Sequence, residues 1–168
     1  QAGASDSTRM LIAGGAGDGW QRTRNISFIT MATTGDTSFF GELIRSGAGG
    51  GTPSTEGFRY FDGFASPTRA VFAGGDVATT ADINVIQYVT IQTLGNAETF
   101  GELEKNRSSH TCCSNATRGL IAGGQTPSPN LNSIEFVTIA STGNGTDFGD
   151  LNNAADYLGS ANSSTRAT

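Results

Sequence analysis

The sequence repeats one motif three times, and this repetition restricts the fold more than any other feature. Each copy begins with Thr-Arg and an apolar run that ends in two glycines. An alternating stretch then leads to a Gly-Asp or Gly-Asn turn, and Phe-Gly-acid-Leu closes the copy. The copies begin at Thr8, Thr68 and Thr117, and a fourth Thr-Arg pair stands at Thr165. Self-similarity with a period of about 50 residues is typical of repeat proteins, in which each copy forms one small supersecondary unit.

Each copy is expected to form four short β-strands. The alternation of side chains over Ile134–Ile139 is typical of a strand with one more apolar face, and paired glycines end the strand before it. Phe-Gly-acid-Leu predicts another strand. The remaining strand precedes each Thr-Arg pair, at 60–65, 109–114 and 157–161, where Gly63, Cys112 and Ser160 are all small. Small residues at one register fit a crowded position near an axis.

Composition agrees with an all-β fold. The chain has 168 residues, of which 24 are glycine and 15% are charged, so helical bundles are excluded because glycine weakens helices. Recurring apolar runs and low charge exclude a disordered chain. We predict one repeat domain over residues 1–168. Its units cover about 8–58, 59–107 and 108–168, with an insertion at 46–57 in the first.

The motif resembles known repeats in two respects. Four short strands per copy, with paired glycines ending one strand and an aromatic residue on the next, resemble the kelch repeat of β-propellers. The usual kelch tryptophan is absent, and we expect the phenylalanine of Phe-Gly-acid-Leu to take its packing place. The amino-acid sequence of the third copy, "SNATRGLIAGG … IEFVTIASTGN … DFGDL", also resembles repeats of virion and tail-fibre proteins of tailed phages, especially phages of marine cyanobacteria.

The kelch resemblance implies that this chain needs a partner. Propellers usually contain four to eight blades, so three blades cannot close a ring. Open sheets would leave strand edges that invite pairing. We therefore expect three kelch-like four-stranded blades that complete a ring with another chain or with residues outside this sequence. A two-fold dimer with six blades is the simplest closed assembly.

Charge narrows the class of partner. The formal net charge is −5, so the chain lacks the basic face that nucleic acids require.

No apolar stretch approaches the ~20 residues of a membrane span, and we expect no signal peptide. The first residue is Gln, so we expect either processing or a longer parent protein. Together with the phage resemblance, low charge and abundant Thr, Ser and Gly suggest a virion protein or an extracellular location.

Charged residues recur at equivalent places in the repeat. Each Thr-Arg arginine has a carboxylate later in its own copy, and such regular recurrence favours structural ion pairs within or between blades. The residues concerned are Arg9, Arg69 and Arg118 with Glu42, Glu102 and Asp150.

The loops are the expected place for binding, because variable loops on a rigid scaffold commonly carry function. In a meander, the loop after the second strand and the crossing to the next blade lie on the same face. The non-repeated residues on that face form an aromatic and polar patch, which is typical of sugar or protein binding. The predicted ligand-binding residues are Trp20, Arg22, Arg24, Arg59 and Tyr60. The alternative is that Trp20 packs under its own loop.

The sequence favours a protein without catalytic residues, metal or cofactor. His110 is the only histidine, the adjacent Cys112 and Cys113 face opposite sides of a strand, and no nucleophile-elbow motif occurs. We therefore expect a structural or adhesive virion module, such as a tail-fibre or capsid-associated protein. It would bind copies of itself, other virion proteins or a host-surface glycan. The alternatives are a carbohydrate-active enzyme on a propeller and a kelch-type adaptor that holds another protein.

Overall fold

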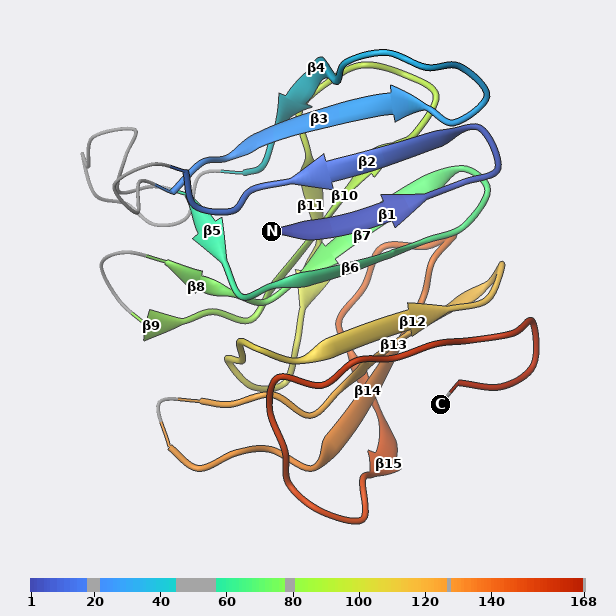
Figure 1. Cartoon of the computed structure of the whole chain (residues 1–168). Coiled ribbons are helices and arrows are strands. Elements are labelled where there is room, and N and C mark those ends of the chain that lie inside the picture. Colours follow the sequence, from blue (N-terminus) through green and yellow to red (C-terminus); the bar gives the residue numbers. More distant parts are fainter. Residues whose placement is uncertain (18–21, 45–56, 78–80, 127, 168) are drawn as a thin grey trace.

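The protein consists of β-strands joined by turns and loops, as the composition predicts. The computed structural model describes residues 1–17, 22–44, 57–77, 81–126 and 128–167. Figure 1 shows the strands gathered into sheets that follow one another along the chain. Over the described ranges, no helix has the length and apolar character needed to cross a membrane.

Three four-stranded antiparallel sheets account for most strands, and each corresponds to one sequence repeat. The first contains β1 (Ala2–Ser5), β2 (Arg9–Ala13), β3 (Asn25–Thr30) and β4 (Ser38–Glu42). The second contains β6 (Asp62–Ala65), β7 (Arg69–Ala73), β10 (Val85–Thr90) and β11 (Glu98–Glu102). The third contains β12 (Thr111–Ser114), β13 (Arg118–Ala122), β14 (Ser133–Thr138) and β15 (Thr146–Asp150). The first sheet thus includes Ala2–Ser5, ahead of the Thr8 start expected for its repeat.

The three sheets share one register. In each sheet the alanine that ends the second strand lies opposite the first isoleucine of the third strand. A bulge in the pairing with the outer strand follows that isoleucine. These isoleucines are Ile26, Ile86 and Ile134. Equivalent residues therefore occupy equivalent places in space, and contacts can be compared between repeats.

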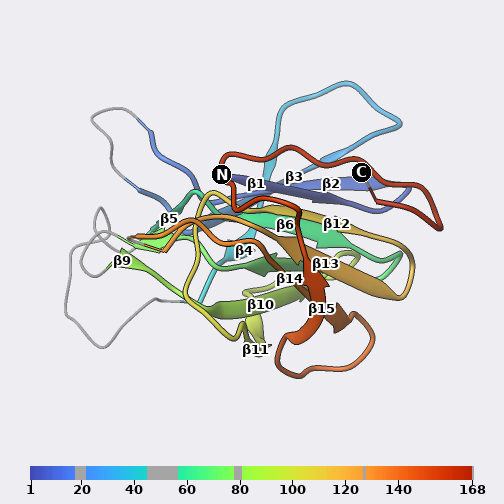
Figure 2. The same cartoon turned by 90° about the horizontal axis from the view of Figure 1, so that it is seen from below.

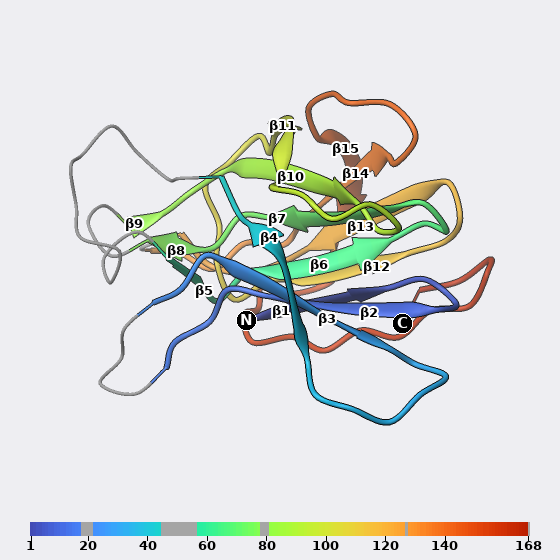
Figure 3. The ribbon, with the colours of Figure 1, turned by 90° about the horizontal axis from the view of Figure 1, so that it is seen from above.

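A small fourth sheet marks one end of the molecule. It contains β5 (Phe58–Arg59), β8 (Asp76–Val77) and β9 (Ala81–Asp82), which pair in the order β5-β8-β9. Figures 1, 2 and 3 all place it opposite the hairpin turns that join the first two strands of each large sheet. We call these the loop end and the turn end. The pairing of β5 with β8 confirms that crossings and second-to-third loops share a face.

The first strands of the three sheets lie next to one another, with β6 between β1 and β12 (Figure 1). The backbone N–H of Cys112 donates to the Asp62 carboxylate at 2.7 Å, and the Ser114 hydroxyl donates to the Ala65 carbonyl at 2.8 Å. Gly63 suits this crowded position, because a Cβ there would lie 2.8 Å from the Phe72 ring. Within the described residues the sheets do not close into a ring.

Each sheet also contacts the one before it through the turn that follows its third strand. The turn that follows β10 donates from Gly95 N–H to the Phe40 carbonyl at 3.1 Å and from Ala97 N–H to the Glu42 carbonyl at 2.8 Å. The turn that follows β14 repeats this pattern on β11, at 2.9 and 2.8 Å. The outer strands contain glycine because a Cβ on Gly41 would lie 2.0 Å from the Gly95 carbonyl oxygen.

The hydrophobic cores lie between the sheets, so burial depends on adjacent repeats. One face of the first sheet packs on the second through side chains that include Leu11, Ile26, Phe40, Ala70, Phe72, Val89 and Ile91. The second packs on the third through side chains that include Phe64, Val71, Ile86, Phe100, Ile121, Val137 and Ile139. A single sheet could not bury both of its faces, which is the usual reason that repeat proteins need neighbouring units.

The segment after the third sheet follows the path of a further first strand. Tyr157 N–H donates to the Ser109 carbonyl at 2.8 Å, and the Ser160 hydroxyl donates to the Cys112 carbonyl at 2.8 Å. The strand expected over 157–161 does not form, and the described residues beyond it contain one isolated bridge, between Asn162 and Ala167. A lasting strand needs a longer partner to pair with than this single residue pair. We call residues 157–167 the tail.

Candidate functional site

Three non-glycine residues adopt left-handed backbone conformations at equivalent positions of the loop end. They are Tyr60 (φ 55°), Ser109 (φ 54°) and Tyr157 (φ 52°). Hydrogen bonds link them in a row, from Ser109 N–H to the Tyr60 carbonyl at 2.7 Å and from Tyr157 N–H to the Ser109 carbonyl. A left-handed backbone conformation is uncommon for residues other than glycine, and residues that adopt it are commonly found at functional positions.

Tyr60 and Tyr157 form an exposed aromatic pair above this row. Their ring centroids lie 6.2 Å apart in an edge-to-face arrangement, and the residues are 38% and 68% exposed. The guanidinium carbon of Arg59 stands 4.9 Å from the centroid of the Tyr60 ring. We call Arg59, Tyr60 and Tyr157 the tyrosine platform. Exposed aromatic rings with hydroxyl groups and a nearby cation suit a ligand that is both apolar and polar, such as a sugar.

An acidic side chain holds the cation of the platform in place. Asp76 accepts from Arg59 Nε at 2.7 Å and from Arg22 Nη2 at 3.4 Å. Backbone pairing of Arg59 with Asp76 between β5 and β8 sets this geometry. Burial lowers the pKa of Arg22, and the Asp76 carboxylate partly opposes that shift. Arg59 is therefore a positioned side chain and not a freely moving surface cation.

The structure brings together only part of the predicted binding patch. Arg22, Arg59 and Tyr60 converge, whereas Arg24 pairs with Glu42 at 2.8 Å and donates to the Leu43 carbonyl. Trp20 and residues 46–56 of the predicted insertion lie outside the described residues. Tyr157 was not predicted, although it precedes its Thr-Arg pair by the same spacing as Tyr60.

All three repeated arginines contact an aromatic neighbour in their own sheet, and two of them also contact the next sheet. Arg9 Nη1 donates to the Ile91 carbonyl and Arg69 Nη1 to the Ile139 carbonyl, both at 3.0 Å. In each sheet the guanidinium also lies 4.4–4.8 Å from the centroid of an aromatic ring on the third strand. These rings belong to Phe28, Tyr88 and Phe136.

Ion pairs within one repeat, one of the two predicted arrangements, do not fit the register. Arg9 lies opposite Thr30, whereas Glu42 lies opposite Asn25 at the other end of β3. The same separation holds for Arg69 and Glu102 and for Arg118 and Asp150. Arg9 and Arg69 therefore connect their sheets to the next through carbonyl contacts, whereas the aromatic contacts of all three arginines stay within one sheet.

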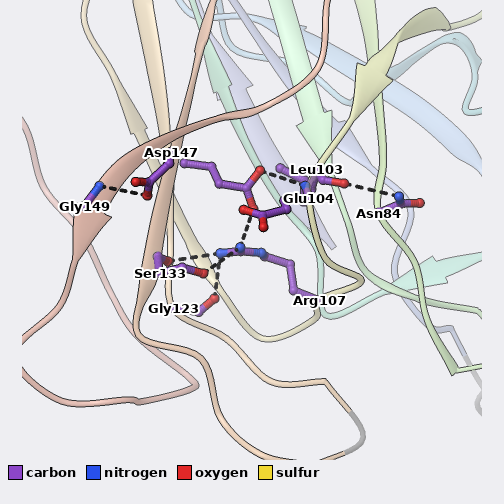
Figure 4. A network of polar contacts seen from close by, with 9 residues as sticks. Asn84, Leu103, Glu104, Arg107, Gly123, Ser133, Asp147 and Gly149 are labelled. Atoms are coloured by element: carbon purple, nitrogen blue, oxygen red, sulfur yellow. Dashed lines mark hydrogen bonds and ion pairs between the residues drawn. The ribbon is translucent and has the colours of Figure 1, made fainter.

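A buried ion pair that the sequence analysis missed joins the second and third sheets (Figure 4). Arg107 and Glu135 pair with side chains only 0% and 1% exposed. Arg107 also donates to the carbonyls of Gly123 and Ser133 at 3.1 and 3.2 Å, and Glu135 accepts from Glu104 N–H at 2.9 Å. We call the contact between the first and second sheets the first junction and that between the second and third sheets the second junction. At the first junction, Phe58 and Gln87 occupy the equivalent places, and Gln87 accepts from Ile44 N–H at 2.7 Å. The ion pair thus replaces an uncharged contact.

A hollow of about 490 Å³ lies between the first strands of the three sheets. Its lining includes Met10, Phe64, Cys112, Cys113 and Asn162. Burial raises the pKa of the Cys112 and Cys113 thiols, so both are protonated and weakly nucleophilic at neutral pH. In the part of the chain that the structure describes, no three His, Cys, Asp or Glu side chains lie close enough to hold a metal ion.

His110 is buried next to the Arg107 network. Burial and the nearby Arg107 charge lower the pKa of His110 from 6.5 to about 3. The equivalent positions hold Phe61 and Leu158, and the three side chains pack against Gly74, Gly14 and Gly123 in the same way. The site is therefore an apolar position occupied by a neutral imidazole.

The His110 site predicts a specific loss of stability in acid. Below pH 6.5 His110 is protonated in the unfolded chain but stays neutral in the folded protein. The contribution of this site to the free energy of unfolding is therefore fully present above pH 6.5 and is lost as the pH falls toward about 3. We expect the free energy of unfolding to fall by about 1.4 kcal/mol per pH unit relative to the His110→Leu variant. Urea unfolding of both proteins between pH 7 and 4 measures this difference. Parallel pH profiles for the two proteins would contradict the assignment.

Comparison with known proteins does not assign the chain to a family. No protein-family model matches the sequence, and no curated protein matches it significantly.

Proposed function

We propose that the chain is a non-enzymatic structural and adhesive module of a virion, such as a tail-fibre or capsid-associated protein. In this proposal its sheets are three kelch-like propeller blades, and the loop end faces a host-surface glycan or a neighbouring protein. The tyrosine platform is the observation that carries the proposal. It combines exposed aromatic rings, a fixed cation and non-glycine backbone strain in one place.

The arrangement of the sheets supports the blade interpretation. Each is a four-stranded antiparallel sheet, and the first strands lie together, as the inner strands of blades do. Cores between the sheets and backbone hydrogen bonds from each turn to the outer strand of the preceding sheet connect consecutive units. Such a repeated scaffold suits adhesion by many weak contacts.

The use of the polar residues supports a scaffold as well. Arg9, Arg69 and the Arg107–Glu135 pair join one sheet to the next. Asp62 also lies between sheets, where it accepts from Cys112 N–H, and burial raises its pKa. These groups are used in contacts within the protein, whereas Tyr60 and Tyr157 are exposed to solvent.

A glycan array probed with the full chain tests the proposal. We expect binding to a subset of glycans, and we expect Tyr157→Ala to weaken it at least about tenfold, because aromatic anchors commonly dominate such contacts. Leu94→Ala is the matched control, because Leu94 is 57% exposed and lies in the turn that joins β10 to β11, outside the tyrosine platform.

Three outcomes would contradict this function. They are absence of glycan binding together with absence of binding to purified virion proteins, equal binding by the Tyr157→Ala variant, and cleavage of the bound glycan. Cleavage would favour the carbohydrate-active enzyme instead.

A further inference from the structure

Two apolar side chains are exposed on opposite sides of the array although their equivalents are buried. Phe148 on β15 is 50% exposed, whereas Phe40 and Phe100 are 2% and 3% exposed. Met31, after β3, is 50% exposed, whereas Ile91 and Ile139 are fully buried. At each internal junction, the buried phenylalanine belongs to the earlier sheet and the buried isoleucine belongs to the later sheet. The third sheet therefore exposes the surface that an earlier sheet uses, and the first sheet exposes the surface that a later sheet uses.

The backbone of β15 repeats this asymmetry. At the two internal junctions a Cβ on the outer-strand glycine would meet a carbonyl oxygen of the next turn, at 2.0 Å for Gly41 and 2.1 Å for Gly101. At Gly149 nothing lies within 4 Å. The carbonyls of Phe148 and Asp150 correspond to those that accept from the next turn at the internal junctions. The edge of β15 therefore has open space where each internal junction places the turn of the next sheet.

The turn after β3 carries the complementary groups. Gly35 and Thr37 correspond to the donors Gly95 and Ala97 of the second repeat, and Asp36 corresponds to Asn96. The Asn96 side-chain oxygen accepts from Glu42 N–H at 3.0 Å, a role that the Asp36 carboxylate can perform for Asp150 N–H. Arg118 corresponds to Arg9, which donates to Ile91, so its expected acceptor is the Met31 carbonyl.

We propose that the edge of β15 binds the turn at residues 31–37 of a second copy of this chain, in a head-to-tail junction that reproduces the two internal ones. Phe148 and Met31 become buried in this junction. If both ends of each copy engage, two copies close into a ring of six units. The inference rests on the proposed blade arrangement and names the surfaces through which the assembly forms.

The tail takes part in this association. Its residues 159–162 correspond to Ala2–Ser5, so the tail and the β1 strand of an incoming copy are alternatives for one position beside β12. We therefore expect β1 of the second copy to replace the tail. One contact of the internal junctions has no counterpart in the proposed junction. Gln87 and Glu135 each accept from a backbone N–H of the preceding sheet, and Ser27, which stands at the equivalent place, has too short a side chain to do so.

Native mass spectrometry and sedimentation over a concentration series test the junction. We expect wild type to reach twice the 17.3 kDa chain mass. Met31→Asp and Phe148→Asp are each expected to weaken association at least about tenfold. Leu94→Asp is the control, because Leu94 is an equally exposed apolar residue at an internal turn. Circular dichroism melting identifies any variant that fails to fold, and folded Met31→Asp alone suffices for the test.

Mixing the two variants gives the sharpest result. Met31→Asp retains an intact β15 edge and Phe148→Asp retains an intact turn, so the mixture is expected to recover a one-to-one dimer that neither variant forms alone. In hydrogen exchange, association is expected to protect residues 31–37 and to deprotect 159–167. A monomer at every concentration would overturn the proposal, as would dimerisation unaffected by either variant or lost in the mixture. Glycan binding by the monomeric variants separates this test from that of the proposed function.

Discussion

Replacing Glu135 with glutamine is expected to lower the free energy of unfolding by about 3–5 kcal/mol. The change leaves the Arg107 guanidinium fully buried without its opposite charge. Burial already lowers the pKa of Arg107, with Glu135 the largest opposing influence, so the charged form depends on this partner. Chemical denaturation at neutral pH measures the loss.

The first junction supplies a matched control for this prediction. There, Phe58 and Gln87 stand where Arg107 and Glu135 stand at the second junction. The double variant Arg107→Phe, Glu135→Gln therefore installs two residues that are already buried at the equivalent places of the first junction, and we expect it to recover most of the lost stability. A buried ion pair exchanged for an uncharged pair is often close to neutral. Additive losses in the double variant would show that the charges are not coupled.

Replacing Gly119 with alanine is the other change for which we expect a large effect. A Cβ at this position would lie 2.0 Å from the nearest atom of the Phe64 ring, which is itself 4% exposed and confined by the core between the second and third sheets. We expect a loss of about 1–3 kcal/mol, the usual cost of overpacking a core. Thermal or denaturant unfolding measures it.

The same change is expected to have the opposite sign when Phe64 is replaced by alanine. Phe64→Ala leaves a cavity, and the methyl group that Gly119→Ala introduces then fills part of it. The first junction contains this combination, with Ala4 and Ala70 at the equivalent places in its core. We therefore expect Gly119→Ala to stabilise the Phe64→Ala protein. Destabilisation in both backgrounds would mean that the glycine is required for another reason.

The strands and the shared loop face could be predicted from local pattern. Alternating side chains, paired glycines and Gly-Asn turns act within a few residues, so they indicate strands and turns without knowledge of the rest of the chain. For the same reason Arg59 and Tyr60 could be placed on one face with Arg22. Tyr157 followed the same spacing but was overlooked because its repeat is incomplete.

The Arg107–Glu135 pair had no comparable local signal. Arg107 lies outside the repeated motif, and Glu135 occupies an alternating position that is equally typical of a solvent-exposed polar residue. Only the packing of one sheet on another decides whether that face is buried. The within-repeat pairing of Arg9 with Glu42 failed for a related reason, because strand register separates the two residues.

The sequence by itself determined that the chain forms repeated antiparallel sheets, because strand alternation and turn chemistry depend only on neighbouring residues. The tertiary structure alone decided which side chains become partners and which surfaces stay open. Such contacts join residues far apart in the chain, and their energy depends on burial between sheets. Phe40, Phe100 and Phe148 occupy the same place in the motif, yet Phe148 alone of the three is exposed, because no following sheet of the described chain packs against its own.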